Sequence, residues 1–267
     1  MLGRAVAVLD AFGDTDVSLS VAELVRRVAL PKTTVHRMVA DLVHLGLLER
    51  SGRDVALGVH LFELGCRVPA RRRLLETGLS YMQDLYTATR EDVVMGVLDG
   101  SEVLCIVRVN SHAGRGSGMT EGDRLPAHAT ALGKALLAFS PRAVVARAIA
   151  AGLRPVTPST IVVPDVLLQE LARTCRTGVA YAREEDVVGT VSVAAPILSD
   201  GRDVLGALSV SGPARRFEPT RLADAVRVAA VGISRRLGGC SGTRQPWSSV
   251  TSVAAAGRSH RRHPVPA

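Results

Sequence analysis

The sequence predicts a multidomain protein that joins a small, mainly α N-terminal module to an α+β domain with a mostly antiparallel sheet. Two observations carry this prediction. From Gly3 to Leu45, apolar residues recur at the spacing of short helices, and a hairpin pattern follows them. From Val93 onward, alternating apolar stretches around Asp-Gly pairs are interleaved with helical stretches, which is typical of adjacent hairpins covered by helices.

The N-terminal elements follow in order. The apolar spacing of "GRAVAVLDAFG" predicts a helix over about 3–12. In "LSVAELVRRVALP", Glu23 stands three residues after Ser20, a capping-box pattern for a second helix that stops before Pro31. A third helix begins near Lys32, because proline suits a first helical turn. "LLERSGRDVAL" then predicts two short strands around a Ser-Gly turn. Three short helices and a hairpin are the outline of a winged helix-turn-helix.

The C-terminal elements begin after a basic, then amphipathic helical segment that we interpret as a connector. A hairpin is expected around Asp99-Gly100, three helices follow, two more strands flank a second Asp-Gly turn, and "EPTRLADAVRVAAVGISRRLG" closes the domain as a helix. Beyond Gly239 the chain has four arginines, no acid and no periodicity, which predicts a disordered basic tail. The expected boundaries are a winged helix-turn-helix at 1–65, a linker helix at 66–90, an α+β domain at 91–239 and the tail at 240–267.

The charge balance points to a polyanionic partner only weakly. The whole chain carries +8, but residues 1–66 hold seven Lys and Arg against eight Asp and Glu, so 7 − 8 gives a net charge of −1 for the N-terminal module. A DNA-binding hypothesis therefore has to rest on where the cations stand. The hydrophobic content of 47% is ample for packed cores and excludes a mostly disordered protein.

The four cysteines lie far apart without a C-x-x-C pair, so we expect reduced structural thiols and no zinc cluster, disulfide framework, metal or other cofactor. The N-terminus lacks a charged segment followed by an apolar one, and charges or turn residues break every apolar run well before the length of a membrane span. We therefore expect a cytoplasmic protein without a membrane partner.

Polar side chains crowd into the first two turns of the third predicted helix. Thr33 and Arg37 lie on the face opposed to its apolar stripe, so this face is free to enter a major groove. Arg37 suits a bidentate pair with guanine, Lys32 suits a phosphate, and the threonines suit phosphate or base edges. The alternative is a solvated face on a structural helix. The candidate DNA-binding residues, including two arginines that flank the hairpin turn, are Lys32, Thr33, Thr34, His36, Arg37, Arg50 and Arg53.

In these residues and in later motifs, the chain resembles the IclR family of bacterial transcription regulators. The matching motifs are "GRAVAVLDAF", "LSVAELVRRVALPKTTVHRMVADLVHLGLLER", "LGVHLFELG", "LPAHATALGKALLAFSP", "TPSTI", "RTGVAYAREEDVVGTVSVAAPI" and "GALSVSGPARRF". The resemblance implies a winged helix-turn-helix that binds a double-stranded DNA operator, a linker helix used in dimerisation, and a GAF-like or profilin-like effector-binding domain. Where the family usually has an aromatic and a basic residue after the hairpin turn, this chain has Val55 and Ala56, so we expect a weaker grip on phosphate there.

The resemblance also implies an effector site between the start of the "HATALGKA" helix and the facing strands. Backbone N–H groups at a helix start attract carboxylate, and inward-facing serines add neutral donors. His128 is interpreted as a structural residue at the helix entry, although a ligand or metal role is open. The candidate effector-binding residues are Ala131, Leu132, Ala182, Ser192, Ser209 and Ser211.

The function predicted is therefore a DNA-binding regulator, more specifically a repressor, whose homodimer or homotetramer responds to a small carboxylic or aromatic acid. A GAF-like enzyme or a ligand-binding protein without a DNA role are the alternatives. The serines and His128 are residue types of a hydrolase, but the sequence has no G-x-S-x-G motif and no activated thiol is indicated, so we expect no catalytic residues.

Overall fold

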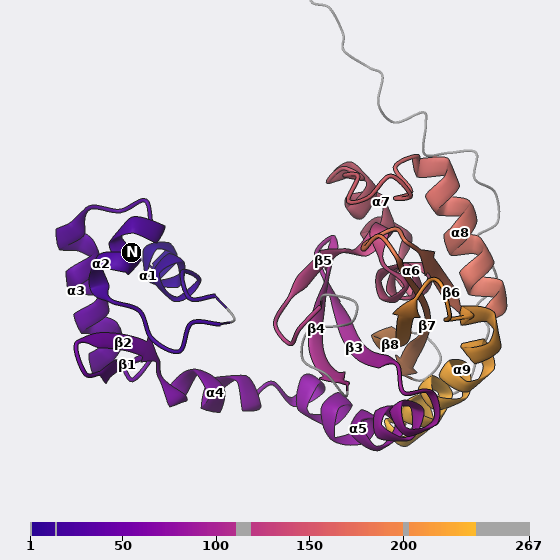
Figure 1. Ribbon diagram of the computed structural model, residues 1–267, viewed down its shortest axis with the longest axis horizontal. Helices are drawn as coiled ribbons and strands as arrows, with labels where there is room; N and C mark the ends of the chain where they lie inside the picture. The colour runs from indigo at the N-terminus through magenta and orange to yellow at the C-terminus, as the bar shows by residue number, and fades with distance from the viewer. Residues whose placement is uncertain (1, 14, 111–118, 200–202, 239–267) are drawn as a thin grey trace, which may run out of the picture. The chain divides into compact units, whose positions relative to one another are not determined.

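The computed structural model describes residues 2–13, 15–110, 119–199 and 203–238 (Figure 1). Its contacts divide the chain into two compact units between Arg72 and Arg73. The basic tail predicted at 240–267 and the second Asp-Gly pair, at 200–201, lie outside the described residues. None of the described helices combines the length and the apolar character needed to cross a membrane.

The first unit consists of short helices, a two-stranded hairpin and a further helix. Its hydrophobic core gathers from all three N-terminal helices and from both strands, with Val8, Leu24, Val35 and Val55 fully buried. Backbone hydrogen bonds between Leu19 and Val55, 2.8 and 2.9 Å long, attach the hairpin to the segment before the second helix. The elements are α1 (Leu2–Leu9), α2 (Val21–Arg27), α3 (Lys32–His44), β1 (Leu48–Ser51), β2 (Asp54–Leu57) and α4 (Val59–Cys66).

Local chemistry explains most of these boundaries. The Ser20 hydroxyl accepts a hydrogen bond from the Glu23 N–H at 3.1 Å, as the capping pattern predicted. Pro31 stands just before α3 as its N-cap, one position earlier than a first-turn proline. The hairpin turn also differs by one residue from the prediction. Ser51 pairs with Asp54, so the turn is formed by Gly52 and Arg53, and Gly52 has the positive φ of 62° that this turn requires.

The second unit contains one six-stranded sheet in the order β5-β4-β3-β8-β7-β6, in which every neighbouring pair is antiparallel. The predicted mostly antiparallel sheet is thus confirmed. Its strands are β3 (Asp92–Asp99), β4 (Glu102–Val109), β5 (Arg124–Pro126), β6 (Ala180–Arg183), β7 (Thr190–Ser199) and β8 (Asp203–Pro213). Its helices are α5 (Pro69–Thr89), the 3-10 turn η1 (Ala127–Ala129), α6 (Ala131–Phe139), α7 (Arg142–Ala150), α8 (Pro164–Thr177) and α9 (Pro219–Arg236).

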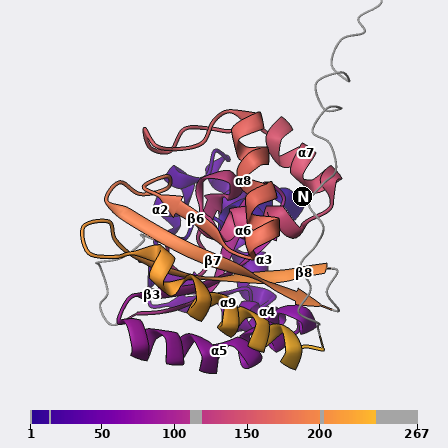
Figure 2. The same ribbon diagram turned by 90° about the vertical axis from the view of Figure 1, so that its right-hand side faces the viewer.

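Helices cover both faces of this sheet. Figure 2 shows α5 and α9 on one side and α6, α7 and α8 on the other, and two separate hydrophobic clusters fill the two interfaces. Along β8, Leu208 and Val210 belong to the cluster under α5 and α9, whereas Ala207 belongs to the cluster under α6. Gly206 lets α5 approach β8 closely, because a Cβ there would lie 2.8 Å from Leu74 Cδ2.

Some elements lie outside the sequence prediction. The helix expected over 66–90 corresponds to α5, while α4 occupies a preceding stretch for which no helix was predicted. The short strands β5 and β6 were not predicted either. The first Asp-Gly hairpin is present, with Gly100 at φ 64° and Asp99 paired with Glu102.

Candidate functional site

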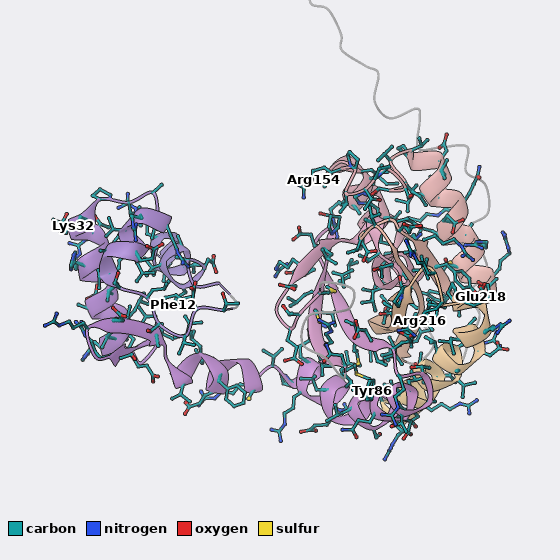
Figure 3. The ribbon with its side chains drawn as sticks, in the orientation of Figure 1. Phe12, Lys32, Tyr86, Arg154, Arg216 and Glu218 are labelled. Carbon is teal, nitrogen blue, oxygen red and sulfur yellow. The ribbon has the colours of Figure 1, made fainter. Side chains whose placement is uncertain are left out.

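The polar cluster of α3 lies on the surface of the first unit. Lys32, Thr33, His36 and Arg37 are exposed and Thr34 is half-buried. The opposite stripe of the same helix is buried in the core and consists of Val35, Met38, Val39 and Leu42. Figure 3 shows Lys32 at the outer edge of the unit, whereas Phe12 lies toward its interior. The packing of α3 therefore leaves its polar side chains available to a partner.

Two sets of cations in this unit differ in their partners. On α2, Arg26 and Arg27 form ion pairs with Glu23, and Arg27 also pairs with Asp16. Lys32 and Arg37 on α3 have no hydrogen bond or ion pair within the part of the chain that the structure describes. The same holds, over those ranges, for the exposed arginines beside the hairpin turn, Arg50 and Arg53. The cations of α3 and the hairpin are thus exposed and not engaged in an ion pair among the described residues, as is Arg4 on α1, whereas both arginines of α2 are paired.

The start of α3 adds partial positive charge to this face. No side chain caps the helix, and its backbone hydrogen bonds begin with the N–H groups of Thr34 and Val35, both bound to the Pro31 carbonyl. The N–H groups of Lys32 and Thr33 have no partner among the described residues, so the positive end of the helix dipole is open to an anion.

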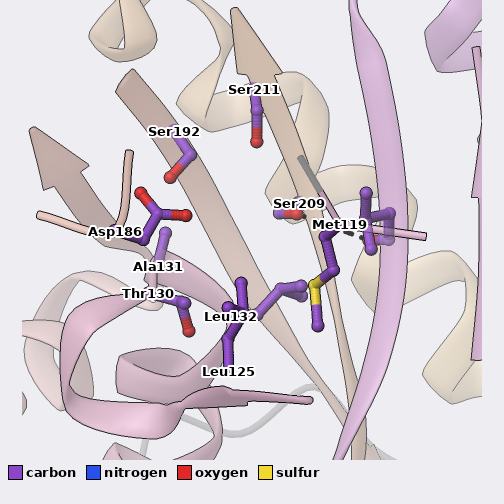
Figure 4. Close-up of a pocket in the computed structure, with 10 residues that line it drawn as sticks. Met119, Leu125, Thr130, Ala131, Leu132, Asp186, Ser192, Ser209 and Ser211 are labelled. Atoms are coloured by element: carbon purple, nitrogen blue, oxygen red, sulfur yellow. Dashed lines mark hydrogen bonds between the residues drawn. The ribbon is translucent and has the colours of Figure 1, made fainter. Parts of the chain in front are cut away.

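The second unit contains a pocket between the start of α6 and the sheet (Figure 4). It encloses about 280 Å³, including the open space at its mouth. Five of the six predicted effector residues line it. The lining residues are Val94, Met119, Leu125, Thr130, Ala131, Leu132, Asp186, Ser192, Ser209 and Ser211.

The helix side of the pocket presents N–H groups. The Thr130 hydroxyl caps α6 by accepting a hydrogen bond from the Gly133 N–H at 2.9 Å, and the Lys134 N–H is bound to the Thr130 carbonyl at 3.0 Å. The N–H groups of Ala131 and Leu132 have no partner in the described chain, and both residues line the pocket at the positive end of a helix.

The sheet side of the pocket presents hydroxyl groups. Ser192 of β7 pairs directly with Ser211 of β8, and Ser209 lies two residues from Ser211 on the same face of the strand. The Ser209 hydroxyl lies 3.4 Å from the Val94 carbonyl, a long hydrogen bond. No hydrogen bond engages the hydroxyls of Ser192 and Ser211 in the described chain, so both are available to a ligand.

Asp186 lines the pocket but was not among the predicted residues. Its Oδ1 is the one buried side-chain oxygen or nitrogen without a hydrogen-bond partner in the described ranges. Burial raises the pKa of Asp186 to about 6, and the negative Glu185 adds to this effect, while nearby backbone N–H groups and Lys134 oppose it. In the sequence, "AREEDVVG" has the composition of a solvated loop, so no local pattern predicts this burial.

Two predicted residues lie elsewhere. Ala182 is fully buried on β6, where it pairs with Ser192, and the pocket wall does not include it. The His128 side chain is buried, and its Nε2 donates to the Arg154 carbonyl at 3.0 Å, which agrees with the structural interpretation of this residue. Among the residues that the structure describes, His, Cys, Asp and Glu side chains form no group able to hold a metal ion.

Comparisons with known proteins match both units. A family model described as "IclR helix-turn-helix domain" matches residues 1–52, and one described as "Bacterial transcriptional regulator IclR C-terminal" matches residues 66–235. The transcriptional repressor IclR of Escherichia coli is 31% identical over 229 residues, which span 84% of this chain and 83% of that protein. The regulator KipR of Bacillus subtilis is 30% identical, over 83% of this chain and 90% of that protein.

Among solved structures, an IclR homolog from Microbacterium hydrocarbonoxydans complexed with 4-hydroxybenzoate is 32% identical. It aligns with a TM-score of 0.82 over 88% of this chain and 98% of its own.

Proposed function

This chain belongs to the IclR family of bacterial transcriptional regulators, and from that premise we propose that α3 and the β1–β2 hairpin bind its operator under the control of a small acid. The observation that carries the proposal is that the cations of α3 and the hairpin are exposed and in no ion pair among the described residues, next to a helix start whose first N–H groups are open. By contrast, both arginines of α2 are engaged with acids.

The roles proposed for the individual residues follow their chemistry. Arg37, on the exposed face of α3, reads guanine through two parallel hydrogen bonds. Lys32 and the open N–H groups at the start of α3 hold phosphate, with Thr33, Thr34 and His36 beside them. Arg50 and Arg53 hold phosphate from the hairpin.

The effector proposed is a small carboxylic or aromatic acid. Support comes from the N–H groups of Ala131 and Leu132, which suit a carboxylate, and from the hydroxyls of Ser192, Ser209 and Ser211. The Microbacterium homolog that contains 4-hydroxybenzoate supports the same class.

A homodimer or homotetramer is proposed from the surface of α4. This helix has no buried residue, although Val59 is 66% exposed and Phe62 is 72% exposed. Two apolar side chains three residues apart lie on one helical face, and a second copy of the same helix is the partner that a symmetric dimer supplies. Two copies of α3 then fit the two half-sites of a near-palindrome.

We further propose a cytoplasmic repressor without catalytic activity. Its DNA-binding part lies at 1–65, its linker helix at 66–90 and its effector-binding part at 91–239. Against thiol catalysis, burial raises the pKa of Cys105 to about 12, and the Cys175 thiol is buried and donates to the Ala138 carbonyl at 2.8 Å. Cys240 lies outside the described residues.

The experiment that tests DNA binding is a gel-shift titration of the full chain on the fragment upstream of its own gene, at several salt concentrations. Arg37→Ala is expected to weaken binding by about 1–3 kcal/mol, while Arg26→Ala serves as the matched control because it removes the same charge from an exposed, paired position. Lys32→Gln is expected to lower the salt slope by about one. Equal affinities for the wild type, Arg37→Ala and Arg26→Ala would remove α3 as the reading helix.

A further inference from the structure

The carboxylate of Asp186 is unfavourable in a pocket that binds small acids without further selection. A carboxylate in a partly buried site repels a ligand carboxylate, and burial makes this repulsion stronger than it would be in water. The lining of the same pocket also includes Ala131 and Leu132, whose N–H groups have no partner in the described chain. Figure 4 shows the carboxylate of Asp186 turned toward the space between Ser192 and Ala131, so it faces the ligand space.

The loop that carries Asp186 is held firmly by its neighbours. Glu185 accepts two hydrogen bonds from Lys134 Nζ, both 2.7 Å long, and both residues of this ion pair are buried. The hydroxyl of Thr160 donates to the Glu185 carbonyl at 2.6 Å, and that of Thr157 donates to the Glu184 carbonyl at 2.6 Å. Glu184 itself adopts a φ of 58°, which a residue other than glycine seldom adopts. These contacts fix the backbone on the N-terminal side of Asp186.

The same contacts leave Asp186 without a cation of its own. Lys134 is the nearby positive charge, but its ammonium group is already shared between the two oxygens of Glu185. Asp186 Oδ1 is therefore buried, without a hydrogen-bond partner among the described residues and held in place, a condition that is unfavourable unless something supplies a donor. Because Asp186 lines the pocket, a ligand bound there is placed to supply it.

We propose that Asp186 selects effectors that bear a hydroxyl or amino group, by accepting a hydrogen bond from that group while the carboxylate of the ligand is held at the start of α6. This inference rests on the proposed effector function and narrows its ligand class. A site with an unpaired buried acceptor rejects a ligand of equal size that lacks the donor, because the acceptor then stays unsatisfied. Unsubstituted acids of the same size are therefore excluded.

The test is isothermal titration calorimetry of the full chain with two sets of acids of matched size. Glycolate and glycine are compared with propionate, and 4-hydroxybenzoate and 4-aminobenzoate with 4-methylbenzoate. Each set contains acids with a hydroxyl or amino group, called donor acids, and one acid with a methyl group in that place. In the wild type, the tightest-binding donor acid is expected to bind at least tenfold more tightly than the methyl-bearing acid of its set. Asp186→Leu, which has similar volume and no acceptor, is expected to bring this ratio close to one, whereas Asp186→Asn retains an acceptor and part of the preference. Asp224→Leu, on α9 at the other face of the sheet, is the control and is expected to keep the wild-type ratio.

Each other outcome overturns the inference. These outcomes are a ratio near one in the wild type, a ratio unchanged in Asp186→Leu, or an absence of binding by every donor acid in both sets. If Asp186→Leu fails to fold, Asp186→Ala replaces it, because alanine also lacks an acceptor, and a ratio equal to that of the wild type in this variant overturns the inference. The gel shift on the upstream fragment needs no ligand, so the proposed DNA-binding function stands or falls separately.

Discussion

Lys134 and Glu185 form a buried ion pair in which the ammonium nitrogen lies 2.7 Å from both carboxylate oxygens. Lys134 belongs to α6, one turn after the N–H groups that line the pocket, and Glu185 directly precedes Asp186. The pair therefore ties the helix that begins at the pocket to the loop that carries Asp186.

Breaking this pair on one side is expected to be costly. Lys134→Met leaves the Glu185 charge buried without its partner, and we expect a loss of about 3–5 kcal/mol in the free energy of unfolding. The double variant Lys134→Met with Glu185→Gln removes both charges and is expected to recover much of that loss. Urea denaturation followed by circular dichroism measures both. A double variant as unstable as the single one would mean that the pair acts through packing and not through charge.

The raised pKa of Asp186 predicts a pH-dependent cost to stability. The native state holds the proton up to about pH 6, whereas the unfolded chain releases it near the ordinary value of 3.8. The contribution of Asp186 to stability is therefore fully present below pH 3.8 and is lost as the pH rises from there through about 6. Asp186→Asn escapes this loss, and we expect it to be more stable than the wild type by about 2 kcal/mol at pH 7.5 and equally stable near pH 4. Urea titrations at four pH values give the difference, with Asp224→Asn as the control for an exposed carboxylate. A constant difference across the pH range would contradict the prediction.

Gly133 is expected to tolerate no side chain. A Cβ at this position would lie 2.1 Å from the Ala127 carbonyl oxygen, a backbone atom that cannot swing away. Gly133→Ala therefore has to push α6 away from η1, and we expect a destabilisation of about 3 kcal/mol together with loss of ligand binding at the start of α6. Gly3→Ala is the matched control, because it lies in α1 with no atom within 4 Å and alanine favours a helix. Thermal unfolding of the two variants distinguishes a close approach from a general effect of replacing glycine.

Two exposed valines test whether α4 is the dimer interface. Val59 on α4 and Val228 on α9 are 66% and 68% exposed. Val59→Asp is expected to shift the protein toward the monomer in sedimentation velocity, because it puts a charge into an apolar contact, while Val228→Asp leaves the distribution unchanged. Dissociation by Val228→Asp alone would instead place the interface on α9.

The sequence predicts those elements whose cause is local. The α3 stripe, the Ser20 cap and the glycine of the first Asp-Gly turn each depend on residues within one turn or hairpin, and the structure contains all three. The predicted turn between β1 and β2 differs from the observed one by one residue. The sequence allows either Ser-Gly or Gly-Arg in the turn, and only the pairing of Ser51 with Asp54 sets the register.

The remaining features depend on distant contacts. The strand β6 has only four residues, and its position is set by pairing with β7 and not by its own alternation. Asp186 follows two exposed-looking acids, and its burial arises from contacts of its loop with Lys134 and with Thr157 and Thr160, far away in the sequence. A carboxylate whose role comes from the folded environment has no sequence pattern that reveals it.

One strand connects the pocket to the opposite layer of the second unit. Ser209 and Ser211 of β8 face the ligand space, while Gly206, Leu208 and Val210 between and before them face the layer of α5, where Leu74 packs against Gly206. Because both sets of side chains share one backbone, a ligand that displaced β8 would also displace the strand face on which α5 packs. A substitution at Gly206 would then be felt on both sides of the same strand.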